Sequence, residues 1–312
     1  MAVFFGIVAL AALATPDMSA LADVADREIE WSVGPAAQTG LDGRISLRHS
    51  LDPGAQTNDA IAVTNLSESA ATFSVATGTG VIGADGAFDI VQADQDEGQW
   101  VEVDGLEAGQ VTLAPGEVRI LPVRIQVPVG AAPGDHPAGI AVGLSQGQAL
   151  TVTNRIGVRV HLRVNGEVAP ALSVSVTGAS FSPSWIPFAP GKLTVGYEVA
   201  ATGNVRLGAR ASAESFGLFG IGKSTVQDNP ITELLPGEKT SRTMTLDAPA
   251  LFWLWGDVSV VPTVVGEDEV SPPQALAADF SVAAVPWTGV AVVLLLAGTI
   301  TAVKLRARRA TP

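Results

Sequence analysis

The chain has 312 residues, a formal net charge of −13 and no cysteine. The missing thiols exclude disulfides, cysteine nucleophiles and cysteine-ligated metal sites, so burial of apolar cores must hold the domains together. Residues 23–303 contain 30 acidic and 14 basic side chains, a balance of −16 that should repel nucleic acid and anionic lipid.

The N-terminus has the features of a secretory signal peptide. An apolar run from Phe4 to Ala14 is too short to span a bilayer, and Pro16 and a small-residue triplet ending at Ala22 follow it. We therefore expect residues 1–22 to be a signal peptide that is cleaved before Asp23. Because no basic residue precedes the apolar run, an uncleaved anchor is the alternative.

The first half of the chain, residues 23–166, has the period of half-buried strands. Apolar residues recur at every second position, and Pro-Gly turns such as Pro53-Gly54 separate the runs. In the segment 155–164, Ile156, Val158, Val160, Leu162 and Val164 should share one face. Many short strands without an intervening helical segment predict an antiparallel, immunoglobulin-like sandwich.

An acidic segment, residues 83–105, interrupts this pattern. We interpret it as a long surface loop around one short strand near Trp100. Asp94, Asp96 and Glu97 could supply oxygen ligands to calcium, but they lack the full EF-hand spacing. A solvated acidic loop is the simpler interpretation, and a calcium-dependent adhesin is the function that the alternative would imply.

Residues 167–281 resume the strand period and repeat features of the first half. The sequence Leu113-Ala-Pro-Gly-Glu117 returns as Leu234-Leu-Pro-Gly-Glu238, and Pro53-Gly54 returns as Pro190-Gly191. The Pro-Gly marks are further apart in the first half, by about the length of the acidic loop. We therefore predict a fold that is all-β, with two tandem immunoglobulin-like sandwiches of one plan, the first carrying an insertion.

The basic residues of the first half are all arginines, and several should point outward from strands. Guanidinium groups pair bidentately with carboxylates or phosphates, so Arg155, Arg159 and Arg163, with Trp100, are the candidate contacts for a wall polymer or an acidic partner. The alternative is that these arginines meet Asp and Glu across strands. If they grip a ligand, replacing all three by Gln should weaken wall binding and leave the melting temperature near that of the wild type.

Aromatic residues are concentrated in the second half, where most must be core. The run 250–255 is apolar without alternation, so one of its faces should be exposed. Exposed aromatics mark contact with a protein or a membrane. Phe252, Trp253 and Trp255 are the candidate protein-contact tract.

No catalytic or cofactor motif is convincing. Residues 78–83 match the dinucleotide fingerprint by letter, but a strand-like segment follows them in place of the required helix. His49, His136 and His161 have no second ligand at a metal-like spacing, and nucleophile elbows are absent. We expect no enzyme activity, no cofactor and no bound metal.

The C-terminal apolar stretch, residues 282–303, is long enough to cross a bilayer as a helix. Trp287 would lie at the headgroup level, and Lys304, Arg306, Arg308 and Arg309 form a basic tail within residues 304–312. The positive-inside bias puts this tail in the cytoplasm and the preceding residues outside. A buried core helix is the alternative, but it would show one polar face.

Four tracts of the first half resemble the WxL-interacting proteins of Gram-positive bacteria: residues 113–117, 127–130, 133–140 and 155–166. The resemblance covers about residues 28–166, although His136 stands where that family usually has an aromatic residue. It implies a peptidoglycan-binding-type first domain, a second sandwich, a membrane helix and a basic tail. The implied partners are peptidoglycan and a WxL-type surface protein.

The sequence thus predicts a single-pass type I protein of the cell membrane, with its ectodomain facing the cell wall. This ectodomain would bind peptidoglycan or another wall polymer, a WxL-type surface protein, or both. The alternative is an accessory subunit of a membrane complex, in which the tract near Trp253 packs on a neighbouring protein.

Overall fold

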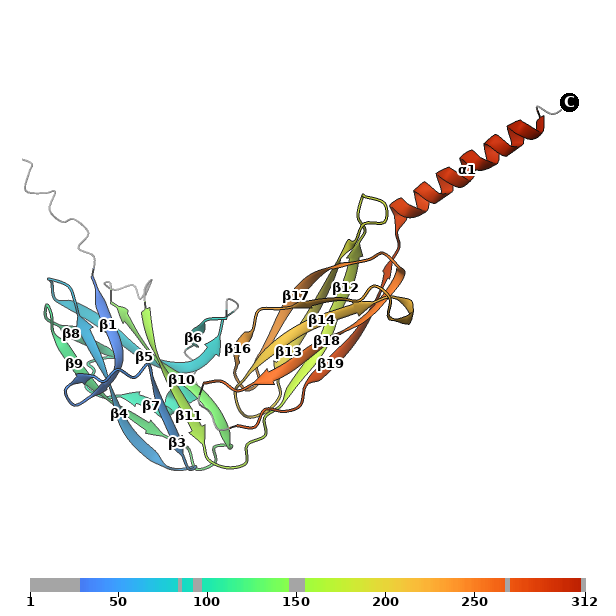
Figure 1. The fold of residues 1–312 in the computed structure, drawn as a ribbon. Helices are drawn as coiled ribbons and strands as arrows, with labels where there is room; N and C mark the ends of the chain where they lie inside the picture. The colour runs from blue at the N-terminus through green and yellow to red at the C-terminus, as the bar shows by residue number, and fades with distance from the viewer. Residues whose placement is uncertain (1–28, 84–85, 92–96, 146–154, 267–269, 310–312) are drawn as a thin grey trace, which may run out of the picture.

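A computed structural model describes residues 29–83, 86–91, 97–145, 155–266 and 270–309 (Figure 1). The predicted signal peptide at 1–22, and Asp94 and Asp96 of the acidic loop, lie outside these residues. The described chain forms two β-sandwiches followed by one C-terminal helix, which confirms the predicted fold class.

The first sandwich, Trp31 to Val164, packs two sheets over one core that includes Phe73, Leu121 and Ile140. One sheet has the order β2-β1-β4-β9-β7, and the other has the order β3-β11-β10-β5-β6, with β8 also pairing with β5. The strands are β1 (Trp31–Ala37), β2 (Gly40–Leu41), β3 (Ser46–Leu51), β4 (Gln56–Asn65), β5 (Ala71–Ile82), β6 (Phe88–Val91), β7 (Val101–Val103), β8 (Gln110–Leu113), β9 (Val118–Gln126), β10 (Gly134–Leu144) and β11 (Arg155–Val164). A short 3-10 helix, η2 (Glu97–Trp100), precedes β7.

The second sandwich, Leu172 to Ala284, has its own core around Tyr197, Leu207 and Leu254. Its sheets have the orders β12-β13-β17 and β15-β14-β18-β19, with β16 on β14. The strands are β12 (Leu172–Ser182), β13 (Gly191–Ala201), β14 (Leu207–Phe216), β15 (Ser224–Gln227), β16 (Ile231–Leu234), β17 (Lys239–Ala248), β18 (Phe252–Thr263) and β19 (Leu276–Ala284). A 3-10 turn, η3 (Leu218–Gly220), joins β14 to β15.

The two sandwiches share one plan. The series β1-β4-β9 of the first corresponds to β12-β13-β17 of the second, and β5-β10-β11 corresponds to β14-β18-β19. The repeated Pro-Gly-Glu turns occupy equivalent places, between β8 and β9 and between β16 and β17. In both turns the glutamate accepts a hydrogen bond from a backbone N–H three residues earlier: Ala114 to Glu117 at 2.8 Å and Leu235 to Glu238 at 3.2 Å.

The helix α1 (Trp287–Arg309) projects from the end of the second sandwich (Figure 1). Its segment Trp287–Arg306 is long and apolar enough to cross a membrane, and very little of it is buried. The sequence predicted that the membrane-spanning helix starts at residue 282. In the structure, residues 282–284 belong to β19, and Val282 packs against the second core. Only Val285 and Pro286 separate the last strand from the helix.

Candidate functional site

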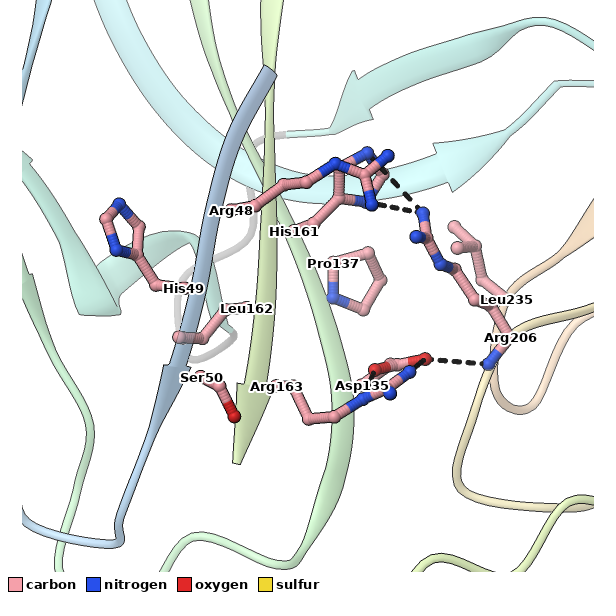
Figure 2. A pocket seen from close by; sticks show the side chains of 10 residues that line it. All are labelled: Arg48, His49, Ser50, Asp135, Pro137, His161, Leu162, Arg163, Arg206 and Leu235. Carbon is pink, nitrogen blue, oxygen red and sulfur yellow. Dashed lines mark hydrogen bonds and ion pairs between the residues drawn. The ribbon is translucent and has the colours of Figure 1, made fainter. Parts of the chain in front are cut away.

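A cavity of about 320 Å³ lies at the joint between the sandwiches (Figure 2). The first sandwich lines it from β3, β10 and β11, and the second contributes the turn before β14 and the turn after β16. Its lining residues include three arginines, two histidines and one carboxylate: Arg48, Arg163, Arg206, His49, His161 and Asp135. The cavity is therefore cationic, although residues 23–303 as a whole are strongly acidic.

Asp135, near the start of β10, links the two sandwiches on one side of the cavity. Its carboxylate accepts hydrogen bonds from Arg163 Nε at 2.6 Å and Arg163 Nη2 at 2.9 Å. The same carboxylate accepts the backbone N–H of Arg206 at 2.9 Å, and the backbone N–H of Asp135 donates to the carbonyl of Asn204 at 2.8 Å. These bonds cross the joint in both directions, so they fix the first sandwich against the β13–β14 turn of the second.

Arg206 fills the other side of the joint, where its side chain is only 5% exposed. Its Nη1 donates to His161 Nδ1 at 2.7 Å and to Glu233 Oε1 at 3.1 Å. Glu233 also accepts from Arg159 of β11 at 2.7 Å. One carboxylate of the second sandwich thus compensates two guanidiniums, one from each sandwich, because buried charges need partners.

His161 is held neutral in this setting. Burial, followed by the positive charges of Arg206 and Arg48, lowers the pKa of His161 from 6.5 to about 4. A neutral ring keeps an unprotonated nitrogen that can accept from Arg206. The interaction of these two residues therefore requires a pH above the folded pKa of the histidine.

Asn204 closes the joint at its base with three hydrogen bonds. Its Nδ2 donates to the carbonyls of Pro133 at 2.9 Å and Glu167 at 2.8 Å, and its Oδ1 accepts from the backbone of Ala169 at 2.7 Å. Gly134 has φ +132°, and a Cβ there would lie 2.3 Å from the carbonyl oxygen of Asn204. Only glycine allows this close approach of the two sandwiches.

The structure divides the predicted arginine set between two places. Arg163 lines the cavity at the joint, while Arg155 and Arg159 line a second hollow of about 220 Å³ beside Phe88 and Asp89. Arg155 pairs with Asp89 at 2.7 Å, and the guanidinium of Arg159 lies 4.2 Å from the centre of the Phe88 ring. All three arginines are engaged with carboxylates, as the ion-pairing interpretation expects, and wall binding through them stays a prediction.

Trp100 does not lie with these arginines. It packs against the first core, and its ring lies against that of His136 in a tilted arrangement, with a centroid distance of 4.7 Å. The Nε2–H of His136 donates a hydrogen bond to the Ala132 carbonyl oxygen at 2.8 Å. Trp100 is thus in part a packing residue of the first sandwich.

The predicted contact tract lies at the start of β18, at the end of the second sandwich next to α1. Phe252, Trp253 and Trp255 are exposed, whereas Leu254 is buried. Exposed and buried positions alternate only from Trp253 onward, because Phe252 at the start of the strand is exposed as well. Trp287, Lys304 and Arg306 of α1 are also exposed, and Arg308 and Arg309 lie in its last turn.

Sequence reasoning missed the residues that make the joint: Asp135, Asn204, Arg206 and Glu233. One sequence feature could have pointed to Arg206. It stands between Val205 and Leu207, which are both fully buried, and a charged residue inside a buried apolar run requires a buried partner. The sequence could not show which residue this partner is, because Glu233 comes close to Arg206 only through the pairing of β16 with β14.

The geometry of the joint favours holding and binding. Its charged groups are arranged in ion pairs and backbone hydrogen bonds, and guanidinium groups of the kind that border the cavity can bind carboxylates or phosphates. Within the described part of the chain, no three His, Asp or Glu side chains converge as metal ligands.

Comparisons with known proteins give only distant likenesses. No family model matches the chain, and no curated protein matches it. Among solved structures, a class 5 fimbriae chaperone, CfaA, aligns with 80% of this chain and 97% of its own at 12% identity and a TM-score of 0.38. The periplasmic chaperone SfaE (13% identity, 80% and 99% covered, TM-score 0.32) and the E. coli chaperone DraB (9%, 81% and 96%, 0.34) align similarly.

Proposed function

We propose that the chain is a single-pass, membrane-anchored surface protein whose two sandwiches form a rigid binding ectodomain. The observation that carries this proposal is the connection of β19 to α1 through two residues. An apolar helix able to span a bilayer follows a folded sandwich directly, so the membrane and the ectodomain must be neighbours. With the basic tail inside, the orientation is type I and the sandwiches face the cell wall.

The ligand that we propose is an anionic wall polymer such as peptidoglycan, a WxL-type surface protein, or both. The resemblance of the first half to WxL-interacting proteins supports this choice. The cationic cavity at the joint and the hollow at Arg155 and Arg159 are the places where carboxylate or phosphate groups would meet guanidiniums on an otherwise acidic ectodomain.

Binding to wall material tests this proposal. The full chain in mild detergent is incubated with insoluble wall sacculi, and the bound fraction is measured after sedimentation. We expect co-sedimentation that survives moderate salt. Arg155→Gln should weaken it, because this arginine is half exposed and its pair with Asp89 is at the surface.

Arg119→Gln is the matched control, since Arg119 also forms an exposed ion pair, with Glu117, but lies on β9 in the other sheet. Equal loss in both variants would count against a site at Arg155. No co-sedimentation of the wild type would count against wall binding altogether.

An accessory role in a membrane complex is the second candidate function. The exposed side chains of Trp253 and Trp255, close to the membrane helix, favour it. A complex of defined size that is isolated in mild detergent and is lost in Trp253→Ser would support this role over wall binding.

A further inference from the structure

The end of the second sandwich beside α1 carries a surface of exposed apolar side chains. They come from three loops: Trp185, Ile186 and Phe188 between β12 and β13; Leu218, Phe219 and Ile221 between β14 and β15; and Phe252 and Trp253 at the start of β18. We call these residues the apolar tip. Strand register puts them at one end, because Ser182 pairs with Lys192, Ser215 with Ser224, and Phe252 with Ala284.

The apolar tip is both highly exposed and free of charge. Trp185 is 93% exposed and Phe219 is 91% exposed. The segments 183–190, 217–222 and 248–255 contain no charged residue. Single exposed apolar side chains are ordinary, but a contiguous group from three loops indicates a contact surface.

The helix α1 begins at the same end of the second sandwich, beside the loop that follows β12 (Figure 1). Thr288 Oγ1 donates to the carbonyl of Ser184 at 3.2 Å, and the Phe188 ring lies 3.1 Å from the position that a Cβ on Gly289 would take. Trp287, which is 65% exposed, adds an aromatic ring of the kind that favours the membrane interface. A bilayer that α1 crosses must therefore lie directly against the apolar tip.

Three phenylalanines of the apolar tip have a strained backbone conformation. Phe188, Phe219 and Phe252 have φ of 64°, 59° and 67°, and they are three of the four non-glycine residues with positive φ in the described part of the chain. This left-handed conformation suits glycine or asparagine and is sterically unfavourable for phenylalanine. Strained positions of this kind gather at functional surfaces.

The first charged side chains away from the tip form a boundary around it. Lys192 pairs with Asp247 at 2.8 Å, and Lys223 pairs with Glu214 at 2.6 Å. Both pairs lie about one or two strand residues below the loops, a depth of a few Å at roughly 3.3 Å per residue. The uncharged layer thus has the thickness expected of a surface that enters the lipid interface and stops there.

We propose that the apolar tip inserts into the interfacial layer of the bilayer that α1 crosses, so that lipid, and not a protein partner, covers it. The second sandwich is then seated on the membrane at a fixed height and orientation. This inference rests on the proposed membrane anchor.

The absence of cysteine makes a direct test clean. Phe219→Cys, in the full chain reconstituted into phosphatidylcholine vesicles, is labelled with an environment-sensitive fluorophore. Vesicles with nitroxide groups near the top of the acyl chains should quench this label, and its emission should be blue-shifted. Thr232→Cys is the control, because Thr232 is exposed on β16 at the opposite end of the same sandwich and its label should show neither effect.

Vesicle flotation distinguishes a failure of the proposed membrane anchor from a failure of the proposed insertion of the apolar tip. A chain that floats with the vesicles while the label at 219 stays unquenched would overturn seating of the tip and leave the anchor intact. A chain that does not float would overturn both. Shielding of the label in native membranes but not in pure lipid would assign the tip to a protein partner and would also overturn the proposal.

A second variant guards against a labelling artefact. With the label moved to Ile221→Cys, adding Phe219→Asn should reduce both quenching and blue shift, because asparagine tolerates positive φ but has no affinity for the lipid interface. Unchanged quenching in this double variant would show that the aromatic ring does not hold the tip in lipid.

Discussion

Arg206 shows how one residue can set the relation between two domains. Its guanidinium is almost fully buried, and it reaches from the second sandwich to His161 of the first while sharing Glu233 with Arg159. Burial of such a group is unfavourable unless every charge is compensated. Ion pairs therefore contribute to holding the two sandwiches together at this joint.

Removing the shared carboxylate should be costly. Glu233→Ala removes a carboxylate that pairs with the buried Arg206 and with Arg159, and we expect the free energy of unfolding to fall by about 3 kcal/mol. Chemical denaturation of the detergent-solubilised chain measures this change. Glu214→Ala is the matched control: its pair with Lys223 is largely exposed, so its loss should cost less than about 1 kcal/mol.

The ion pairs of Arg159 and Arg163 change what we expect of the triple arginine variant. Replacing Arg155, Arg159 and Arg163 together by Gln was expected to leave the melting temperature unchanged. Arg159 and Arg163, however, compensate Glu233 and Asp135, whose side chains are only 9% and 11% exposed. We now expect the triple change to lower the melting temperature, and only Arg155 is suitable for a binding test.

At the scale of elements, the two Pro-Gly-Glu turns have the same local structure but different surroundings. Glu117 bonds within its own sandwich, where it also pairs with Arg119. Glu238 caps the N–H of Leu235 and, through its other oxygen, accepts the N–H of Ile82 of the first sandwich at 2.7 Å. The second turn therefore also contributes a hydrogen bond between the two sandwiches, which the first turn does not.

The two turns can be compared by making the same Glu→Ala change in each. Glu238→Ala removes two backbone hydrogen bonds, one of them between sandwiches, and should lower the free energy of unfolding by about 1–2 kcal/mol. Thermal denaturation of both variants measures the difference. The melting temperature should fall less in Glu117→Ala than in Glu238→Ala, since the bonds of Glu117 are local and exposed. Equal shifts would mean that the bond to Ile82 contributes nothing to stability.

The strands were the predictable part of the fold. Val158, Val160, Leu162 and Val164 alternate into the core as their spacing indicates, although Ile156 is exposed near the start of β11. The repeat also placed equivalent turns correctly, because turn chemistry is local. The asparagines that follow the corresponding strands differ in role: Asn65 ends β4 inside the first sandwich, while Asn204 lies past the end of β13 and bonds across the joint.

The joint and the apolar tip could not be predicted because they depend on contacts between distant segments. Asp135 and Arg206 are 71 residues apart, and nothing local pairs them. The positive φ of Phe219 likewise opposes what phenylalanine prefers, so residue preference points away from the observed turn. The sequence could show that aromatics were exposed near residue 252, but not that three loops bring eight apolar side chains together.

For the whole molecule, the neutral state of His161 should make the arrangement of the sandwiches depend on pH. The unfolded ring gains its proton near pH 6.5 and the folded ring only near pH 4, so the unfolded or opened state binds more protons between these values. Stability is therefore fully present above about pH 6.5 and is lost as the pH falls toward 4. The loss should be about 2 kcal/mol, less than the full shift implies because the ring is partly exposed.

Small-angle scattering of the detergent-solubilised chain measures the opening, and denaturation measures the stability. Between pH 7 and pH 4 we expect a larger maximum dimension and a lower free energy of unfolding. His161→Gln should flatten both dependences, since glutamine has no proton to gain. A wild-type profile as flat as that of the variant would exclude His161 as the titrating group.

The two-residue link between β19 and α1 has a mechanical consequence. Tension that pulls the ectodomain away from the membrane would enter at Ala284 and run along β19, parallel to its axis. The ladder from Phe252↔Ala284 to Val260↔Leu276 would then be loaded in shear, so its hydrogen bonds would share the force instead of opening one after another. Under the proposed wall binding, this geometry would help the second sandwich to stay folded while its ligand is pulled.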